Sequence, residues 1–157
     1  MSADGPLPAH RGGWSLAFRA LYRVLGWMDP LVRAWWQRFG LGNVVLVTIT
    51  GRRTARPRDV LLGLLTADGG WYLGHPDGAA DWTRNLDAAA GRLVVRLPGL
   101  EAAPYVARLL PDGPERERAI LATWQHPFPG DLLYRAARRH VLAVGRYYRL
   151  ERDEVAA

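Results

Sequence analysis

The feature that most constrains this chain is a cationic turn between two apolar runs, which together occupy residues 44–65. Residues 44–49 are largely apolar, Gly51 follows, and the second apolar run begins at residue 60. Two such runs separated by a short turn are typical of a β-hairpin. The turn holds four arginines within seven residues: Arg52, Arg53, Arg56 and Arg58. Guanidinium forks suit phosphate and carboxylate groups, so this tip favours an anionic ligand, with a solvated charged loop as the simpler interpretation.

A second stretch, residues 74–86, carries the other candidate site. A strand leads into a loop with Gly78 and then into the start of a helix, where free backbone N–H groups favour anions. Trp82 and Asn85 are three residues apart and therefore lie on the same side of that helix. Taken alone, the pattern fits equally well a buried tryptophan beside an asparagine that hydrogen-bonds the loop.

The apolar pattern predicts six short strands, at residues 43–50, 60–66, 71–74, 93–97, 102–110 and the end of 141–150. A helix is predicted at residues 81–90, with Asp81 as its N-cap, and further short helices follow residues 113 and 131. Most connections between the strands are hairpins and few are crossover helices. We therefore predict an α+β fold in which an antiparallel sheet or small barrel is surrounded by helices.

Two amphipathic helices are predicted before the first strand, at residues 14–28 and 29–39, with Asp29 and Pro30 starting the second. They carry four of the seven tryptophans, flanked by arginines. A helical hairpin packed on the body, a lid over an apolar substrate and an interfacial helix on a membrane all fit this pattern. We expect residues 1–12 to be a mobile arm, residues 13–150 to be one domain that includes helices at 13–40, and residues 151–157 to be a polar tail.

Composition excludes several classes of function. The chain has 157 residues, a net charge of +6 and no cysteine, which rules out disulfides and a thiol nucleophile. Its two serines lie near the start of the chain, no phosphate-binding glycine loop is present, and the four histidines lack metal-ligand spacing, so we expect no metal site. Redox chemistry remains open, because a bound cofactor can supply it.

The two stretches together resemble the deazaflavin-dependent nitroreductase and quinone reductase family, which has a split β-barrel. Members of that family combine a hairpin of the form TTTGRKSGxPR with a helix start of the form PGGxxxWxRNL. Here residues 48–58 read TITGRRTARPR and residues 77–86 read DGAADWTRNL. The chain departs from the pattern at Arg53, where lysine is usual, and at Ala55, where glycine is usual.

The resemblance implies binding of coenzyme F-420, a deazaflavin with a phosphodiester and an oligoglutamate tail. It places the phosphate and carboxylates at Arg52, Arg53 and Arg58, with Thr54 in the same turn. The residues implied to border the ring and close the pocket are Gly74, His75, Pro76, Trp82 and Asn85. Tyr134 and His126 are the candidate catalytic residues, as proton donors near the acceptor.

The implied activity is that of an oxidoreductase which passes a hydride from reduced F-420 to a small hydrophobic acceptor, such as a quinone, an activated alkene or a nitro compound. Alternatives are a non-catalytic carrier of F-420 or of a hydrophobic ligand, and a flavin mononucleotide (FMN) enzyme of related fold. Nucleic acid is not an expected partner, since the aromatic residues sit at core spacings. We expect a cytoplasmic protein whose N-terminal helices wall or cover the acceptor pocket, with peripheral membrane contact through those helices as the rival role and the oligomeric state left open.

Overall fold

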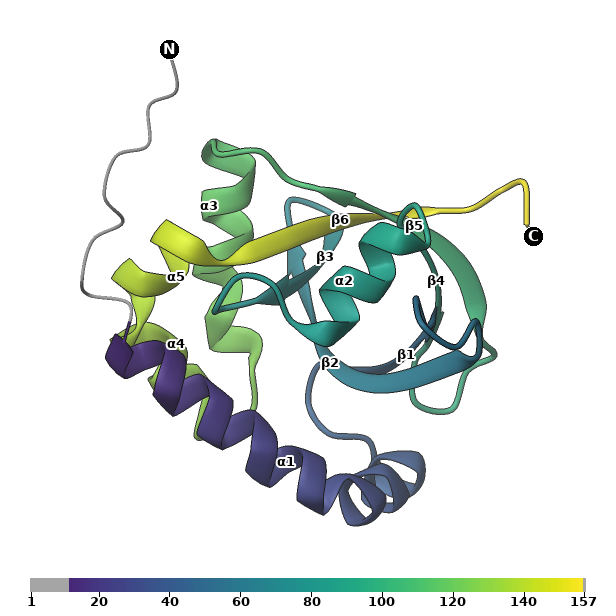
Figure 1. Cartoon of the computed structure of the whole chain (residues 1–157), viewed down its shortest axis with the longest axis horizontal. Coiled ribbons are helices and arrows are strands. Elements are labelled where there is room, and N and C mark those ends of the chain that lie inside the picture. The colour runs from purple at the N-terminus through teal and green to yellow at the C-terminus, as the bar shows by residue number, and fades with distance from the viewer. Residues whose placement is uncertain (1–11, 157) are drawn as a thin grey trace.

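The computed structural model describes residues 12–156 and contains a six-stranded antiparallel barrel with helices around it (Figure 1). The strands are β1 (Val44–Thr50), β2 (Pro57–Ala67), β3 (Gly70–His75), β4 (Arg92–Arg96), β5 (Ala103–Leu109) and β6 (Arg146–Arg152). They close in the order β1-β2-β3-β6-β5-β4. The predicted α+β barrel fold is therefore confirmed. The predicted arm at residues 1–12 lies outside the described residues apart from Gly12, and β6 extends to Arg152, two residues beyond the predicted domain limit.

Buried side chains from all six strands fill the barrel. In β1 the buried positions are Val45, Val47 and Ile49, and the residues between them are less buried. Side chains from the other strands join them in one cluster, which also takes in Trp82 and Leu86 of α2 (Asp81–Ala88). β4 alternates in the same way as β1, whereas β2, β3 and β6 also bury adjacent residues. Because Trp82 and Leu86 belong to the cluster, α2 is fixed against the barrel and its first turn is held near the tip of the β1–β2 hairpin.

The remaining helices form a second apolar cluster on the outside of the barrel. They are α3 (Pro114–Leu121), the 3-10 helix η2 (Ala122–Gln125), α4 (Gly130–Ala136) and α5 (Arg138–Val144). Their buried residues include Ile120, Tyr134 and Val141, and they pack with Tyr147 of β6 and with Phe18 of the N-terminal helix. One end of the N-terminal helix is thereby anchored to this cluster.

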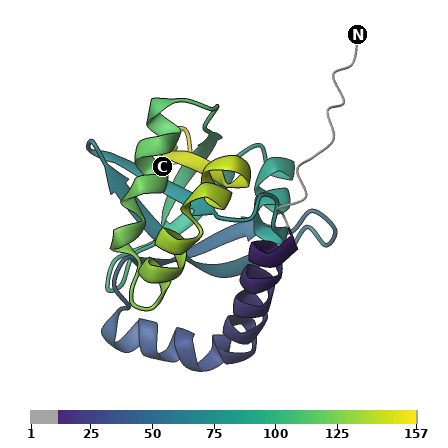
Figure 2. The same ribbon diagram turned by 90° about the vertical axis from the view of Figure 1, so that its left-hand side faces the viewer.

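The N-terminal segment is one helix, α1 (Gly12–Phe39), where the sequence predicted two. Pro30 lies inside it, and the helix changes direction sharply between a first limb (residues 12–28) and a second limb (residues 29–39), as Figure 2 shows. A proline removes a backbone hydrogen bond and crowds the preceding turn, which bends a helix without necessarily ending it. The second limb is held to the barrel by Trp36, whose Nε1 donates to the Val44 carbonyl at 2.7 Å, and by Arg33, which donates to the Asp59 carbonyl at 2.8 Å.

The hairpin tip contains a strained residue. Ala55 has a φ of +52°, in the left-handed region that favours glycine, and its N–H donates to the Gly51 carbonyl at 2.8 Å. The departure from the usual glycine at this position therefore costs the turn free energy.

Replacing Ala55 with glycine should relieve this strain and raise the free energy of unfolding by about 0.5–1 kcal/mol, the steric gain less the added entropy of the unfolded chain. Urea denaturation measures the change. The control is Ala88→Gly, at an exposed alanine in the last turn of α2, which should lower stability. Destabilisation by both substitutions would contradict the proposed strain.

Candidate functional site

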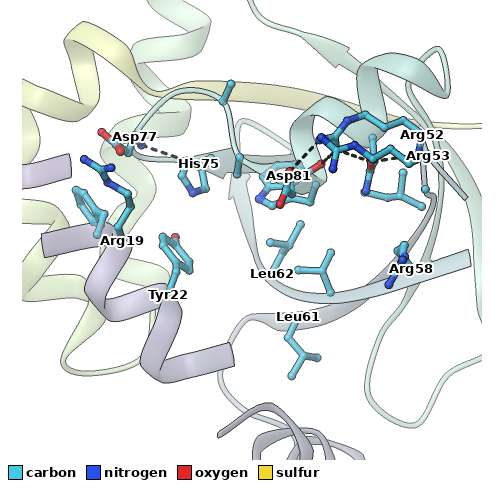
Figure 3. Close-up of a pocket in the computed structure, with 18 of the residues that line it drawn as sticks. Arg19, Tyr22, Arg52, Arg53, Arg58, Leu61, Leu62, His75, Asp77 and Asp81 are labelled. Atoms are coloured by element: carbon cyan, nitrogen blue, oxygen red, sulfur yellow. Dashed lines mark hydrogen bonds and ion pairs between the residues drawn. The ribbon is translucent and has the colours of Figure 1, made fainter. Parts of the chain in front are cut away.

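A cavity of about 760 Å³ lies between the hairpin tip, the start of α2, the loop after β3 and the first limb of α1 (Figure 3). Figure 3 shows Arg52, Arg53 and Arg58 at one end and Tyr22, Arg19 and His75 at the other, with Leu61 and Leu62 between them. The remaining wall residues are Phe18, Ile49, Gly51, Thr54, Val60, Asp77, Ala79, Ala80, Asp81, Trp82 and Asn85. The cavity thus has a cationic end and an aromatic end.

At the cationic end, Arg52 joins the hairpin to α2. Its guanidinium donates to Asn85 Oδ1 at 2.8 Å and pairs with Asp81 Oδ1 at 3.1 Å, and its backbone N–H also points to Asn85 Oδ1, at 3.2 Å. Asp81 is therefore not the N-cap that the sequence predicted. Ala80 occupies the cap position, and the Thr83 hydroxyl accepts a hydrogen bond from its N–H at 2.9 Å.

Arg53 and Arg58 line the same end of the cavity but differ from Arg52 in their contacts. Neither guanidinium makes an ion pair or hydrogen bond with any described residue. Gly51 lets the turn fold closely over them: a Cβ there would lie 3.1 Å from Thr54 Oγ1 and 3.2 Å from Arg58 Cγ. Two cations without counter-ions beside a cavity form a donor set suited to an anion.

At the aromatic end, the ring of Tyr22 stacks on His75 with 5.1 Å between centroids. The Tyr22 hydroxyl lies 3.2 Å from the hydroxyl of Tyr134, which stands behind it in the outer cluster. Burial of the hydroxyl end raises the pKa of Tyr22, although 36% of the residue is exposed, and burial raises the pKa of Tyr134 well above its ordinary value. Both phenols are therefore neutral near pH 7.

His75 is also neutral, and its tautomer follows from one hydrogen bond. Burial lowers its pKa to about 4, against the opposing charge of Asp77. The backbone N–H of Asp77 donates to His75 Nδ1 at 3.3 Å, so the single proton of the neutral ring is on Nε2. His75 thus offers its surroundings a hydrogen-bond donor without a charge.

Trp82 adds a donor whose partner is missing. It lies in the cavity wall with 9% of its surface exposed, and its Nε1 has no hydrogen-bond partner in the described part of the chain. An unpaired buried indole N–H costs free energy, and because this nitrogen is itself shielded from solvent, the structure does not present it to a molecule in the cavity.

Asp77 fastens the beginning of α1 to this wall. Its Oδ1 accepts hydrogen bonds from the Ser15 hydroxyl at 2.5 Å and from His140 Nε2 at 2.8 Å. With Phe18 in the outer cluster and Tyr22 bonded to Tyr134, the first limb of α1 is held at three points along the cavity. The helix is thus part of the site.

No protein-family model matches the chain, and no curated protein does. Solved structures are similar in fold. An F420-H2-dependent reductase (FDR-A) superposes with a TM-score of 0.51 at 19% identity, covering 69% of this chain and 94% of that one. The heme storage protein HutZ from Vibrio cholerae gives a TM-score of 0.53 at 12% identity, covering 81% and 91%. The conserved hypothetical protein Rv2991 from Mycobacterium tuberculosis gives 0.52 at 11%, covering 80% and 81%. At these identities the likeness establishes the fold alone.

The structure brings most of the predicted site residues to one cavity. Its wall includes Arg52, Arg53, Thr54, Arg58, His75, Trp82 and Asn85. Gly74 and Pro76 flank His75 in the chain and are not wall residues. Tyr134 is not a wall residue but contacts the wall residue Tyr22 through its hydroxyl. His126 stacks on Tyr134, with 4.4 Å between the ring centroids, and so lies further from the cavity. Gly63 of β2 makes room for that histidine, since a Cβ there would lie 2.5 Å from His126 Cε1.

The lid interpretation of the N-terminal helices anticipated that α1 borders the cavity, but it did not identify Tyr22 as a wall residue. Phe18 and Tyr22 were visible as an apolar stripe at a spacing of four, which a helix packed anywhere on the body would also show. The second limb, which the lid interpretation also included, supplies no wall residue: Trp36 is 2% exposed against β1 and Phe39 is 67% exposed. A spacing pattern identifies the buried face of a helix but not the surface that the face meets.

The two neutral histidines predict a loss of stability in acid. Burial lowers the pKa of both His75 and His126 to about 4, while an unfolded histidine titrates near 6.5. Protons therefore bind the unfolded chain more strongly, and stability should fall as the pH drops from about 6.5 to about 4, by a few kcal/mol at most. Urea midpoints across this range measure the slope. The double variant His75→Gln/His126→Gln should have a shallower slope, and an unchanged slope would contradict this origin.

Proposed function

We propose that this chain is an oxidoreductase that uses reduced coenzyme F-420 to reduce a small apolar electron acceptor. The observation that carries the proposal is the pair Arg53 and Arg58, which face a cavity without counter-ions while Arg52 beside them is paired. A cofactor with a phosphodiester and carboxylates would supply the missing charge. The fold shared with an F420-H2-dependent reductase supports this choice.

Each part of the wall has a role in this proposal. Arg53 and Arg58 would hold the phosphate and tail carboxylates. When bound, the deazaflavin supplies a hydride. Phe18, Tyr22 and Leu62 would exclude water from the acceptor, which favours an apolar quinone, activated alkene or nitro compound.

Tyr22 is the proposed proton donor to the reduced acceptor. It lines the cavity and keeps its proton at neutral pH, because burial raises its pKa. Its hydroxyl lies 3.2 Å from that of Tyr134, which is therefore a positioning residue and a route for replacing the proton. A hydride and this proton together complete a two-electron reduction. Tyr134 and His126 act behind Tyr22 in this arrangement.

A heme site is the main rival, because HutZ has a similar fold and is described as a heme storage protein. His75 is the histidine in the cavity wall. Its Nδ1 accepts the Asp77 N–H, which leaves Nε2 protonated and unable to ligate iron unless that hydrogen bond is lost. The unpaired arginines suit propionates as well as F-420, so the match of residues 48–58 and 77–86 to the deazaflavin family pattern is what favours F-420.

Cofactor titrations test the proposal. F-420 should bind more tightly than FMN or hemin, and added salt should weaken the binding because the contacts are ionic. Arg53→Ala and Arg58→Ala should each weaken F-420 binding by about 1.5–3 kcal/mol, the value of a hydrogen bond to a charged group. Arg56→Ala is the matched control, since Arg56 has the same charge on the same turn but is not a wall residue. Equal losses of affinity in all three variants would show that F-420 responds only to the overall positive charge of the turn. Preference for FMN or hemin would overturn the assignment.

Tyr22→Phe tests the proton donor. The variant keeps the ring stacked on His75, so F-420 affinity should stay unchanged, while turnover of an acceptor that needs a proton should fall by about a hundredfold. Tyr134→Phe should cause a smaller loss, because the Tyr22 proton remains. Steady-state kinetics with a quinone and an enone measure both effects. Normal turnover in Tyr22→Phe would show that the proton comes from elsewhere, while normal F-420 binding without turnover in the wild type would favour a carrier.

A further inference from the structure

The second limb of α1 carries a stripe of exposed apolar side chains that the cavity does not use. Leu31, Trp35 and Phe39 are four residues apart and are 74%, 58% and 67% exposed. Trp35 and Phe39 pack against each other with 4.7 Å between ring centroids. Side chains at this spacing lie along one face of a helix, and here that face points to solvent.

The opposite face of the same limb already has its partner. Trp36 is 2% exposed and bonds to β1, and Arg33 bonds to β2 and to Asp29. The stripe is therefore not a core face left uncovered by a loose helix. At the end of the limb, Gly40 lies against Pro98 of the β4–β5 turn, and Leu100 in that turn is 63% exposed, so the apolar surface continues onto the barrel.

The cation beside the stripe that has no ion pair with a described residue is Arg38, whereas Arg33 is paired with both Asp29 and Asp59. Arg38 is exposed, and its guanidinium lies 5.9 Å from the Phe39 ring centroid. The β4–β5 turn adds Glu101 and follows Arg96. Aromatic and leucine side chains bordered by arginine on a helix are suited to the headgroup region of an anionic bilayer.

We propose that the Leu31–Trp35–Phe39 stripe docks this protein on an anionic lipid surface, with the second limb of α1 lying in the plane of the membrane. No helix in residues 12–156 is long and apolar enough to cross a bilayer, so the contact is peripheral. The proposal concerns a surface outside the cavity and stands whether or not the cavity binds F-420.

A second copy of the chain is a poorer occupant of this surface. A two-fold symmetric contact would bring the same arginines of both copies together, which costs free energy. The stripe and Leu100 offer a few hundred Å² of apolar surface, whereas a stable dimer buries about 800 Å² on each partner. A lipid surface supplies both the negative charge and an apolar layer.

Sedimentation with sucrose-loaded vesicles tests the proposal. The full chain should pellet with vesicles of phosphatidylcholine containing about one-third phosphatidylglycerol, and much less with phosphatidylcholine alone. Trp35→Ala/Phe39→Ala should lower the partition coefficient about tenfold or more, because two apolar side chains no longer enter the bilayer. Arg38→Gln should lower it about fivefold. These side chains are exposed, so far-ultraviolet circular dichroism and melting temperatures should match the wild type.

The matched control is Leu16→Ala/Val24→Ala, which removes two apolar side chains from the first limb, where they are 62% and 55% exposed. This variant should pellet like the wild type. The proposal is overturned if the wild type does not pellet with anionic vesicles, or if the stripe variant and the control lose binding equally. It is also overturned if analytical ultracentrifugation finds a dimer that the stripe variant dissociates, without vesicle binding, because a second copy then covers the stripe.

Discussion

The candidate site depends on one polar bridge, in which Arg52 joins the tip of the β1–β2 hairpin to the first turn of α2. Arg52 meets both Asp81 and Asn85, and the backbone N–H at the same position also points to Asn85. Trp82 and Leu86 pack α2 against the barrel core. The Arg52 contacts therefore attach the hairpin tip to a helix that is itself held in place. The bridge also pairs the charge of Arg52 with the Asp81 carboxylate. Arg53 and Arg58 therefore remain as the two wall arginines available to bind an anion.

Burial sets the charge of the rest of the cavity. His75 and Tyr22 titrate on opposite sides of neutrality, yet burial favours the uncharged form of each, lowering the pKa of the first and raising that of the second. The rings of Tyr22 and His75 thus stay neutral at the pH at which the hairpin end is cationic, and the charged side chains at their end of the cavity are Arg19 and Asp77. An elongated ligand with an anionic tail and an uncharged, reactive ring matches this division, and such a ligand would be oriented by charge before any ring contact formed.

The sequence predicted the barrel well because its strands are short apolar runs and its hairpins have short turns. The cationic tip and the helix start were also visible, since both depend on residues close together in the chain. Asp81 was misassigned as a cap because a local rule could not include Arg52, which is 29 residues away. The role of Tyr22 was equally hidden, since it arises from a contact with Tyr134 across 112 residues. Helix spacing indicated a buried face, and only the tertiary structure identified the cavity that this face meets.

The bend at Pro30 explains how one helix serves two surfaces. A straight helix of 28 residues would be about 42 Å long, and its second half would leave the barrel. The bend instead returns the second limb to β1 and β2, where Trp36 and Arg33 bind the backbone. The direction in which the helix then docks determines that Trp35 and Phe39, one and three residues from Trp36 in the sequence, face away from the barrel. The first limb thus closes the cavity, and the second presents an apolar and cationic face beside it. An apolar acceptor dissolved in a bilayer would accordingly meet the same helix at the lipid surface and at the cavity wall.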